Sequence, residues 1–146
     1  MAKVVSIDRY KSKLSTKLPG VADDAVAEYR DLLYLQAGIM EEAASEAEEL
    51  LREVKMPPFL FKLDKNYADA YLSMSMKDFV TGDECAEIAF RGIVSETEYA
   101  VLITFECLDG NNLDVETQLF KSGQDEWFIY NFEISTWERG PGKDFF

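Results

Sequence analysis

The chain has 146 residues, of which 47% are hydrophobic and 29% are charged, so we expect one globular domain over 1–146 rather than a disordered chain, a rod or a fibre. It contains no histidine, which excludes Ser-His-Asp and Cys-His catalysis, histidine zinc sites and haem bound through a proximal histidine. Its net charge of −13 disfavours binding to nucleic acid phosphates.

The charges are unevenly distributed along the chain. Residues 1–20 hold five basic residues and one acidic residue, whereas residues 83–146 hold four basic and fourteen acidic residues. The acidic part either keeps the protein soluble or attracts a basic partner. The first residues lack the apolar core of a secretory signal, and no apolar run reaches the ~18 residues of a membrane span, so we expect a cytoplasmic protein.

The first predicted element is a basic amphipathic helix over 7–18, capped by Ser6 and ended by Pro19-Gly20. Residues 1–20 therefore form a basic N-terminal helix or arm. It would dock on the acidic body of the same protein or, as an alternative, bind an anionic membrane surface.

A long helix is predicted over 22–54, because apolar residues recur there at steps of three and four. Such a helix would span ~50 Å, whereas a ten-residue strand spans ~33 Å, so we expect a bend or break near Gly38. The alternative is one unbroken helix that dimerises. The predicted buried stripe is Ala22, Val26, Tyr29, Leu33, Ala37, Met40, Ala44, Ala47, Leu51 and Val54. The predicted solvated face is Glu41, Glu42, Glu46, Glu48, Glu49 and Glu53.

The middle of the chain predicts two shorter elements. Residues 59–63 are typical of a short strand. Residues 66–80 fit either a helix or a strand, and the spacing of Tyr67, Tyr71 and Met74 favours a helix.

From residue 84 the apolar residues alternate, which predicts strands over 84–94, 97–108, 112–121 and 125–137. The breaks between them carry hairpin signals, so we expect a four-stranded antiparallel meander with N-terminal helices packed on it, an α+β fold. Residues 139–146 are interpreted as a tail.

Bringing the apolar faces together predicts the register, because a slip of one residue would invert a strand. Ile88 should lie opposite Ile103, Ile103 opposite Thr117, and Leu119 opposite Phe128. In this register Cys85 and Cys107 lie on opposite faces, which predicts two free thiols. The predicted core face is Ala86, Ile88, Phe90, Tyr99, Val101, Ile103, Phe105, Cys107, Leu113, Val115, Thr117, Leu119, Phe128, Tyr130, Phe132 and Ile134.

The opposite, outer face of the meander holds two candidate sites. An acidic row should contain Glu106, Asp114 and Glu133, with Glu87 one step away. Like charges placed opposite each other are unfavourable, so water, a cation such as Ca²⁺ or Mg²⁺, or a basic partner should offset them. An apolar patch beside the row marks either an interface with a second copy or a partner, or a surface covered by the N-terminal segment or the tail. The patch is Ala89, Ala100, Leu102, Phe120, Trp127 and Ile129.

The order of elements, and the stretch Thr117–Ser135 with a Trp that opens an alternating final strand after a polar turn, resembles the nuclear-transport-factor-2-like (cystatin-like α+β) superfamily. The resemblance implies a curved, cone-like sheet with a pocket and a dimer formed through the sheet. No catalytic residue of that superfamily matches a position in this chain.

Two functions follow as expectations. The first is a non-enzymatic acidic module that binds itself or a basic macromolecule through the outer face. The second is a small-molecule pocket or an acid–base enzyme, which a carboxylate buried in the apolar interior would favour. No catalytic residue, resident metal or cofactor is assigned. The candidate pocket residues are Tyr71, Phe90, Phe105, Tyr130 and Phe132.

Overall fold

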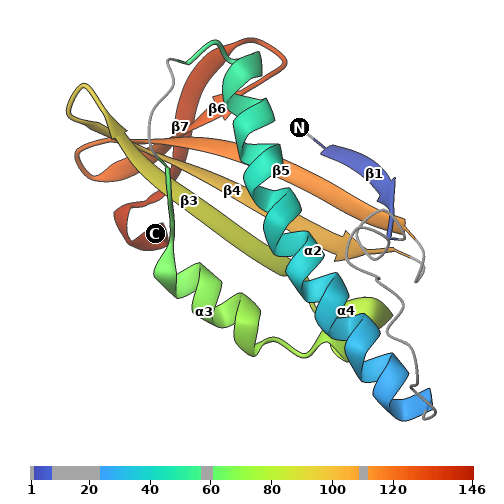
Figure 1. Cartoon of the computed structure of the whole chain (residues 1–146). Coiled ribbons are helices and arrows are strands. Elements are labelled where there is room, and N and C mark those ends of the chain that lie inside the picture. The colour runs from blue at the N-terminus through green and yellow to red at the C-terminus, as the bar shows by residue number, and fades with distance from the viewer. Residues whose placement is uncertain (1, 8–23, 57–60, 109–111) are drawn as a thin grey trace.

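The computed structural model describes residues 2–7, 24–56, 61–108 and 112–146, and these ranges form an α+β fold with three α-helices and a seven-stranded antiparallel sheet (Figure 1). The helices are α2 (Asp24–Glu53), α3 (Lys65–Ser73) and α4 (Met76–Thr81). The strands are β1 (Ala2–Ser6), β2 (Lys62–Leu63), β3 (Ala86–Val94), β4 (Thr97–Cys107), β5 (Asn112–Ser122), β6 (Glu126–Asn131) and β7 (Thr136–Gly142), and β7 leads into a short 3-10 helix, η1 (Lys143–Phe145).

Strand β5 pairs with three other strands. One of its edges pairs with β4, and the other edge is shared by β1 and β6, which pair with different parts of it. The main path through the sheet is β2-β3-β4-β5-β6-β7. The predicted four-stranded meander corresponds to β3–β6 and understates the sheet, which also contains β1, β2 and β7.

Two predicted segments at the end of the chain are wrong. The fourth predicted strand, 125–137, is divided between β6 and β7, and the turn between them places Ser135 at a positive φ of 52°. The predicted tail 139–146 instead begins inside β7 and continues as η1. Pro141 is accommodated because β7 is an edge strand, where a missing backbone N–H costs no ladder bond.

The register confirms two of the three predicted pairings. Ile88 lies opposite Ile103, and Ile103 lies opposite Thr117. The third pairing is shifted by two residues, because Lys121 and not Leu119 lies opposite Phe128. The hairpin closes one step later than predicted, with the N–H of Gly123 donating to the carbonyl of Glu126 at 2.8 Å. A shift of two leaves every side chain on its predicted face.

The core lies between α2 and one face of the sheet, and the alternation predicted the strand residues that line it. At the predicted core positions of β3, β4 and β5, every residue is buried except Phe90 and Tyr99, which are half-buried. Cys107 is among the buried residues and Cys85 is exposed, and both are free thiols. The predicted core residues in and after β6 are less buried: Phe128, Tyr130 and Phe132 are half-buried, and Ile134, in the turn after β6, is 61% exposed.

Helix α2 crosses the sheet diagonally and is continuous through Gly38, so the predicted break is absent (Figure 1). The diagonal path, and an N-terminal end that extends beyond the strands, accommodate its length. The buried stripe is also shifted around the helix from the predicted one: Tyr29 and Leu33 are 64% and 44% exposed. The side chains that α2 buries in the core are Leu35, Ile39, Ala43, Ala47 and Leu50.

Two of the glutamates predicted to be solvated lie on the buried side of α2. Glu42 is 2% exposed and Glu46 is 5% exposed. Lys3 of β1 reaches Glu46 at 2.6 Å, and it lies 3.8 Å from Glu49. The shifted stripe turns Glu46 towards β1, where the charge of Lys3 offsets the cost of burying it. This ion pair ties the first strand to the long helix.

The helix expected over 66–80 is present as two helices. Asp64 caps α3 by accepting from the N–H of Tyr67 at 3.1 Å, and Ser75 caps α4 by accepting from the N–H of Asp78 at 3.3 Å. The cap at Ser75 starts a new helix, and this break explains why the apolar spacing over 66–80 fits neither one helix nor one strand throughout. The strand expected over 59–63 is observed at Lys62–Leu63, and 57–60 lie outside the described residues.

The N-terminal segment begins as a strand, which the sequence did not predict. Ala2–Ser6 form β1, and Ile7 after it is buried. Ser6, predicted to cap a helix, is the last residue of β1. The rest of the predicted helix over 7–18 lies outside the described residues.

Tyr71 links α3 to α2 and provides a pH-dependent stability signal. Its side chain is buried, and its hydroxyl donates to the carbonyl of Gln36 at 2.6 Å. Burial raises the pKa of Tyr71 above its ordinary value of 10.0. Above pH 10 the unfolded chain therefore loses this proton while the folded protein keeps it, and the free energy of unfolding falls as pH rises.

We expect Tyr71→Phe to lower the free energy of unfolding at pH 7 by about 1 kcal/mol, because the hydrogen bond to Gln36 is lost. Between pH 9 and 11 the variant should lose stability less steeply than the wild type. Urea unfolding across this range measures both effects. Parallel curves for the two proteins would contradict the assignment.

Candidate functional site on the outer face of the sheet

The predicted apolar patch is present on the outer face, but it is covered. Five of its residues, Ala89, Ala100, Leu102, Phe120 and Trp127, form a second buried cluster, called here the outer cluster, and each is at most 3% exposed. Ile129, Tyr67 and Phe146 pack against it. Because the third register is shifted, Phe120 lies opposite Ile129 rather than Trp127. Of the alternatives that the sequence offered for the patch, the structure shows cover by the end of the chain, since Phe146 packs on it.

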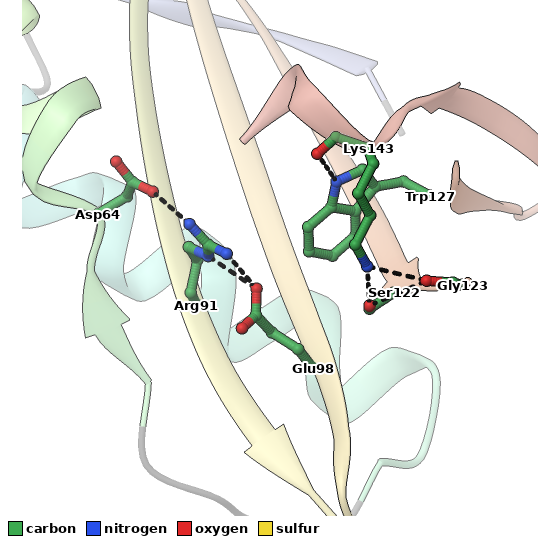
Figure 2. A network of polar contacts seen from close by, with 7 residues as sticks. All are labelled: Asp64, Arg91, Glu98, Ser122, Gly123, Trp127 and Lys143. Carbon is green, nitrogen blue, oxygen red and sulfur yellow. Dashed lines mark hydrogen bonds and ion pairs between the residues drawn. The ribbon is translucent and has the colours of Figure 1, made fainter. Parts of the chain in front are cut away.

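The cover is formed by residues 143–146, called here the C-terminal segment. The ring of Phe146 lies edge-on to Phe120 and Trp127, with centroids 5.1 and 4.9 Å away. Trp127 Nε1 donates to the carbonyl of Lys143 at 3.2 Å, and Lys143 Nζ donates to the carbonyl of Gly123 at 2.8 Å (Figure 2). The side of the cluster nearest α3 is closed by Tyr67.

Beside the outer cluster, Arg91 of β3 lies between two carboxylates (Figure 2). Its Nη1 lies 3.4 Å from Asp64, its Nε donates to Glu98 at 3.0 Å, and its Nη2 forms a second bond to Glu98. Burial alone would lower the pKa of Arg91, but hydrogen bonds and charges from Glu98 and Asp64 raise it, so the guanidinium stays charged. The network joins the start of α3 to β3 and β4.

A groove of about 510 Å³ runs along this network. Lys62, Lys65 and Arg91 line it together with Asp64 and Glu98. Because Arg91 already satisfies two carboxylates, its guanidinium is not available as an anion site. The groove is therefore best explained as the surface of a structural ion-pair network.

The uncovered part of the outer face is acidic. Glu106 lies directly opposite Asp114, and Glu87 and Glu116 lie in the neighbouring row, on either side of Thr104. These four residues are called here the acidic face. Glu87, Glu106 and Glu116 are exposed, and none of the ion pairs found within the described ranges involves any of the four. The pairing of Glu106 with Asp114 was predicted, and the predicted registers also place Glu116 in the row of Glu87 and Thr104, although it was not among the predicted site residues.

Glu133 is not part of the predicted row. It follows β6, in the turn before β7, and its N–H donates to Asn131 Oδ1 at 3.0 Å. It instead lines a groove of about 760 Å³ that begins beside Glu116, next to Ala2 at the start of β1 and where β6 diverges from β5. The acidic face therefore continues into a groove whose walls include Glu116, Glu133, Glu138, Ile129, Tyr130 and Phe132.

The candidate pocket residues do not converge on one cavity. Phe105 and Tyr71 are packed in the core. Tyr130 and Phe132 contact each other at the far end of the sheet, with ring centroids 5.1 Å apart, and Phe90 is half-buried against the core. A small space between β1, α2 and β5, lined by Lys3, Glu46 and Thr117 among others, has about 40 Å³, which suits water and not a substrate.

The described residues offer neither a cluster of metal ligands nor an activated thiol at Cys85. No group of three or more cysteines and carboxylates in residues 2–7, 24–56, 61–108 and 112–146 is placed to hold a metal ion. Partial burial, followed by the charges of Glu106 and Glu87, raises the pKa of Cys85, so this thiol is not activated as a nucleophile. No helix in those ranges is long and apolar enough to cross a membrane.

No family model, curated protein or solved structure matches this chain. The nuclear-transport-factor-2-like resemblance therefore remains a prediction.

Proposed function

We propose that the protein is a non-enzymatic interaction module that binds a basic protein through its acidic face. The main support is the direct pairing of Glu106 with Asp114, flanked by Glu87 and Glu116, on an exposed sheet surface. Like charges at paired positions destabilise a sheet, and a cationic partner removes that cost when it binds.

The charge of the chain also defines the partner. Nucleic acid is disfavoured by the net charge of −13. A second copy that used the same face would bring the same carboxylates together. The partner we propose is therefore a different protein that presents Lys or Arg side chains.

We expect the variant Glu106→Gln/Asp114→Asn to bind an alternating Lys-Ser peptide about fivefold more weakly than the wild type, a loss of ~1 kcal/mol. Raising the salt concentration from about 50 to 200 mM should weaken wild-type binding more than variant binding. Isothermal titration calorimetry measures both effects.

The matched control is Glu41→Gln/Glu48→Gln, which removes the same charge from exposed positions of α2. It should keep wild-type affinity, apart from a small long-range effect. Equal weakening by the two double variants would show that net charge, and not the acidic face, attracts the peptide, and would overturn the proposal.

A further inference from the structure

The outer face of the sheet has two adjoining surfaces, the acidic face and the outer cluster, and the C-terminal segment covers the outer cluster. The register places Ala89, Leu102 and Gln118 in one row, between the acidic face and the rest of the outer cluster. On one side of this row are Glu87 and Glu116, and on the other side are Ala100 and Phe120. An apolar surface therefore adjoins the acidic face, and the C-terminal segment covers it together with Tyr67.

The cover is held by ring contacts and by hydrogen bonds that lie near the surface. Strand β7 ends at Gly142, and the three-residue η1 after it has no side-chain cap. Phe145 is 41% exposed, and its carbonyl accepts a bond of 3.4 Å from the Tyr67 hydroxyl. The bond from Trp127 Nε1 to Lys143 is 3.2 Å long, and the Lys143 ammonium is exposed. Segments whose contacts lie near the surface open far more often than central strands.

The surface beneath the cover has the properties of a binding site. Its base is rigid sheet, its floor contains the small residues Ala89 and Ala100, and its walls are the rings of Phe120 and Trp127. Two phenylalanine side chains cover an area on the order of 300 Å² when they pack, which is the size of a functional apolar patch. Phe145 and Phe146, at the end of the short helix η1, show that apolar rings fit there, with centroids 4.9–5.5 Å from those of the wall residues.

We propose that the C-terminal segment is a displaceable cover, and that a partner segment carrying both basic and apolar side chains takes the place of Phe145 and Phe146 on the outer cluster. The inference rests on the proposed function, because the basic side chains would lie on the acidic face in the adjacent rows. It adds a second requirement, namely that the partner carries a group of apolar side chains next to its basic ones, because the apolar rows of the sheet follow the acidic rows.

The test compares two peptides of equal length and charge, a run of lysines followed by serines, called here Lys-Ser, and the same run followed by leucines, called here Lys-Leu. We expect Phe146→Ala to raise the affinity for Lys-Leu by at least about fivefold and to change the affinity for Lys-Ser by less than about twofold, because only Lys-Leu uses the uncovered cluster. Leu72→Ala, which truncates a 60% exposed apolar side chain on α3, is the matched control and should change neither affinity. An unchanged preference between the peptides in Phe146→Ala would overturn the proposal.

A measurement on the wild type keeps the test independent of the variant's folding. The Trp127 indole N–H, followed by NMR, reports the bond to Lys143. Adding Lys-Leu should shift this signal and expose it to exchange while the amides of β4 stay protected. A complex in which the indole N–H stays as protected as in the free protein would overturn the proposal.

The same signal separates this proposal from the function on which it rests. If neither peptide binds the wild type, the proposed function fails. In that case indole exchange of the free protein still decides whether the cover opens. Exchange at least about 100-fold faster than that of the β4 amides supports local opening, and exchange at the rate of global unfolding overturns it.

Discussion

Trp127→Ala should lower the free energy of unfolding by about 3–5 kcal/mol, the range for removing a large aromatic side chain from a packed core. Trp127 is 1% exposed, contacts Phe146 and donates its indole N–H to Lys143. Two cations also lie near its ring, Arg91 at 5.8 Å and Lys143 at 5.0 Å from the centroid. Urea unfolding followed by circular dichroism measures the loss.

Trp127→Phe separates packing from hydrogen bonding. It keeps most of the apolar area and loses the bond to Lys143, so we expect a loss of about 1–2 kcal/mol. A cost below about 1 kcal/mol for Trp127→Ala would mean that the outer cluster is not a second core. It would also remove the basis for treating the C-terminal segment as the cover of a defined site.

Arg91→Ala should lower the free energy of unfolding by about 2–3 kcal/mol. The Asp64 side chain is 6% exposed and would lose the charge that compensates its burial, and Glu98 would lose two hydrogen bonds. The full ~3–5 kcal/mol of a completely buried pair is not expected, because the Arg91 side chain is 35% exposed and water screens it.

The conservative variant Arg91→Lys should recover less than half of that loss, because one ammonium cannot reproduce the planar guanidinium that contacts two carboxylates. A double-mutant cycle between Arg91→Ala and Glu98→Ala measures the pairwise energy. A coupling energy near zero would show that Arg91 acts through packing against Trp127 rather than through its ion pairs.

The sequence predicted the centre of the sheet because β3, β4 and β5 each bury one face and expose the other. Moving any of them by one residue would bury Glu87, Glu106 or Glu116, so the alternation determines the β3–β4 and β4–β5 registers. The third register was wrong because a shift of two residues buries the same side chains. Alternation cannot distinguish these two pairings, and only the hairpin geometry at Gly123 does.

The errors elsewhere arise where local sequence permits two answers. Helix α2 has two neighbouring apolar stripes, one with Tyr29 and Leu33 and the other with Leu35 and Ile39, and the position of the sheet selects between them. The Gly-Pro-Gly stretch before Lys143 is typical of a tail, although Gly140 is an edge-strand residue whose Cβ would lie 2.8 Å from the carbonyl oxygen of Trp127. The acidic pair was predictable because both members lie in the well-determined registers.

The position of β1 imposes an order on biosynthesis. Ala2 pairs with Glu116, so β1 is synthesised well before β5 and has no partner until β5 has left the exit tunnel. At ~5–20 residues per second, this delay is roughly 5–20 s. During that time β5, whose pairing with β1 places Lys3 beside Glu46, is also missing. The hairpins of β3, β4 and β5 need only local contacts, so they can form first and present an edge to which β1 is added last.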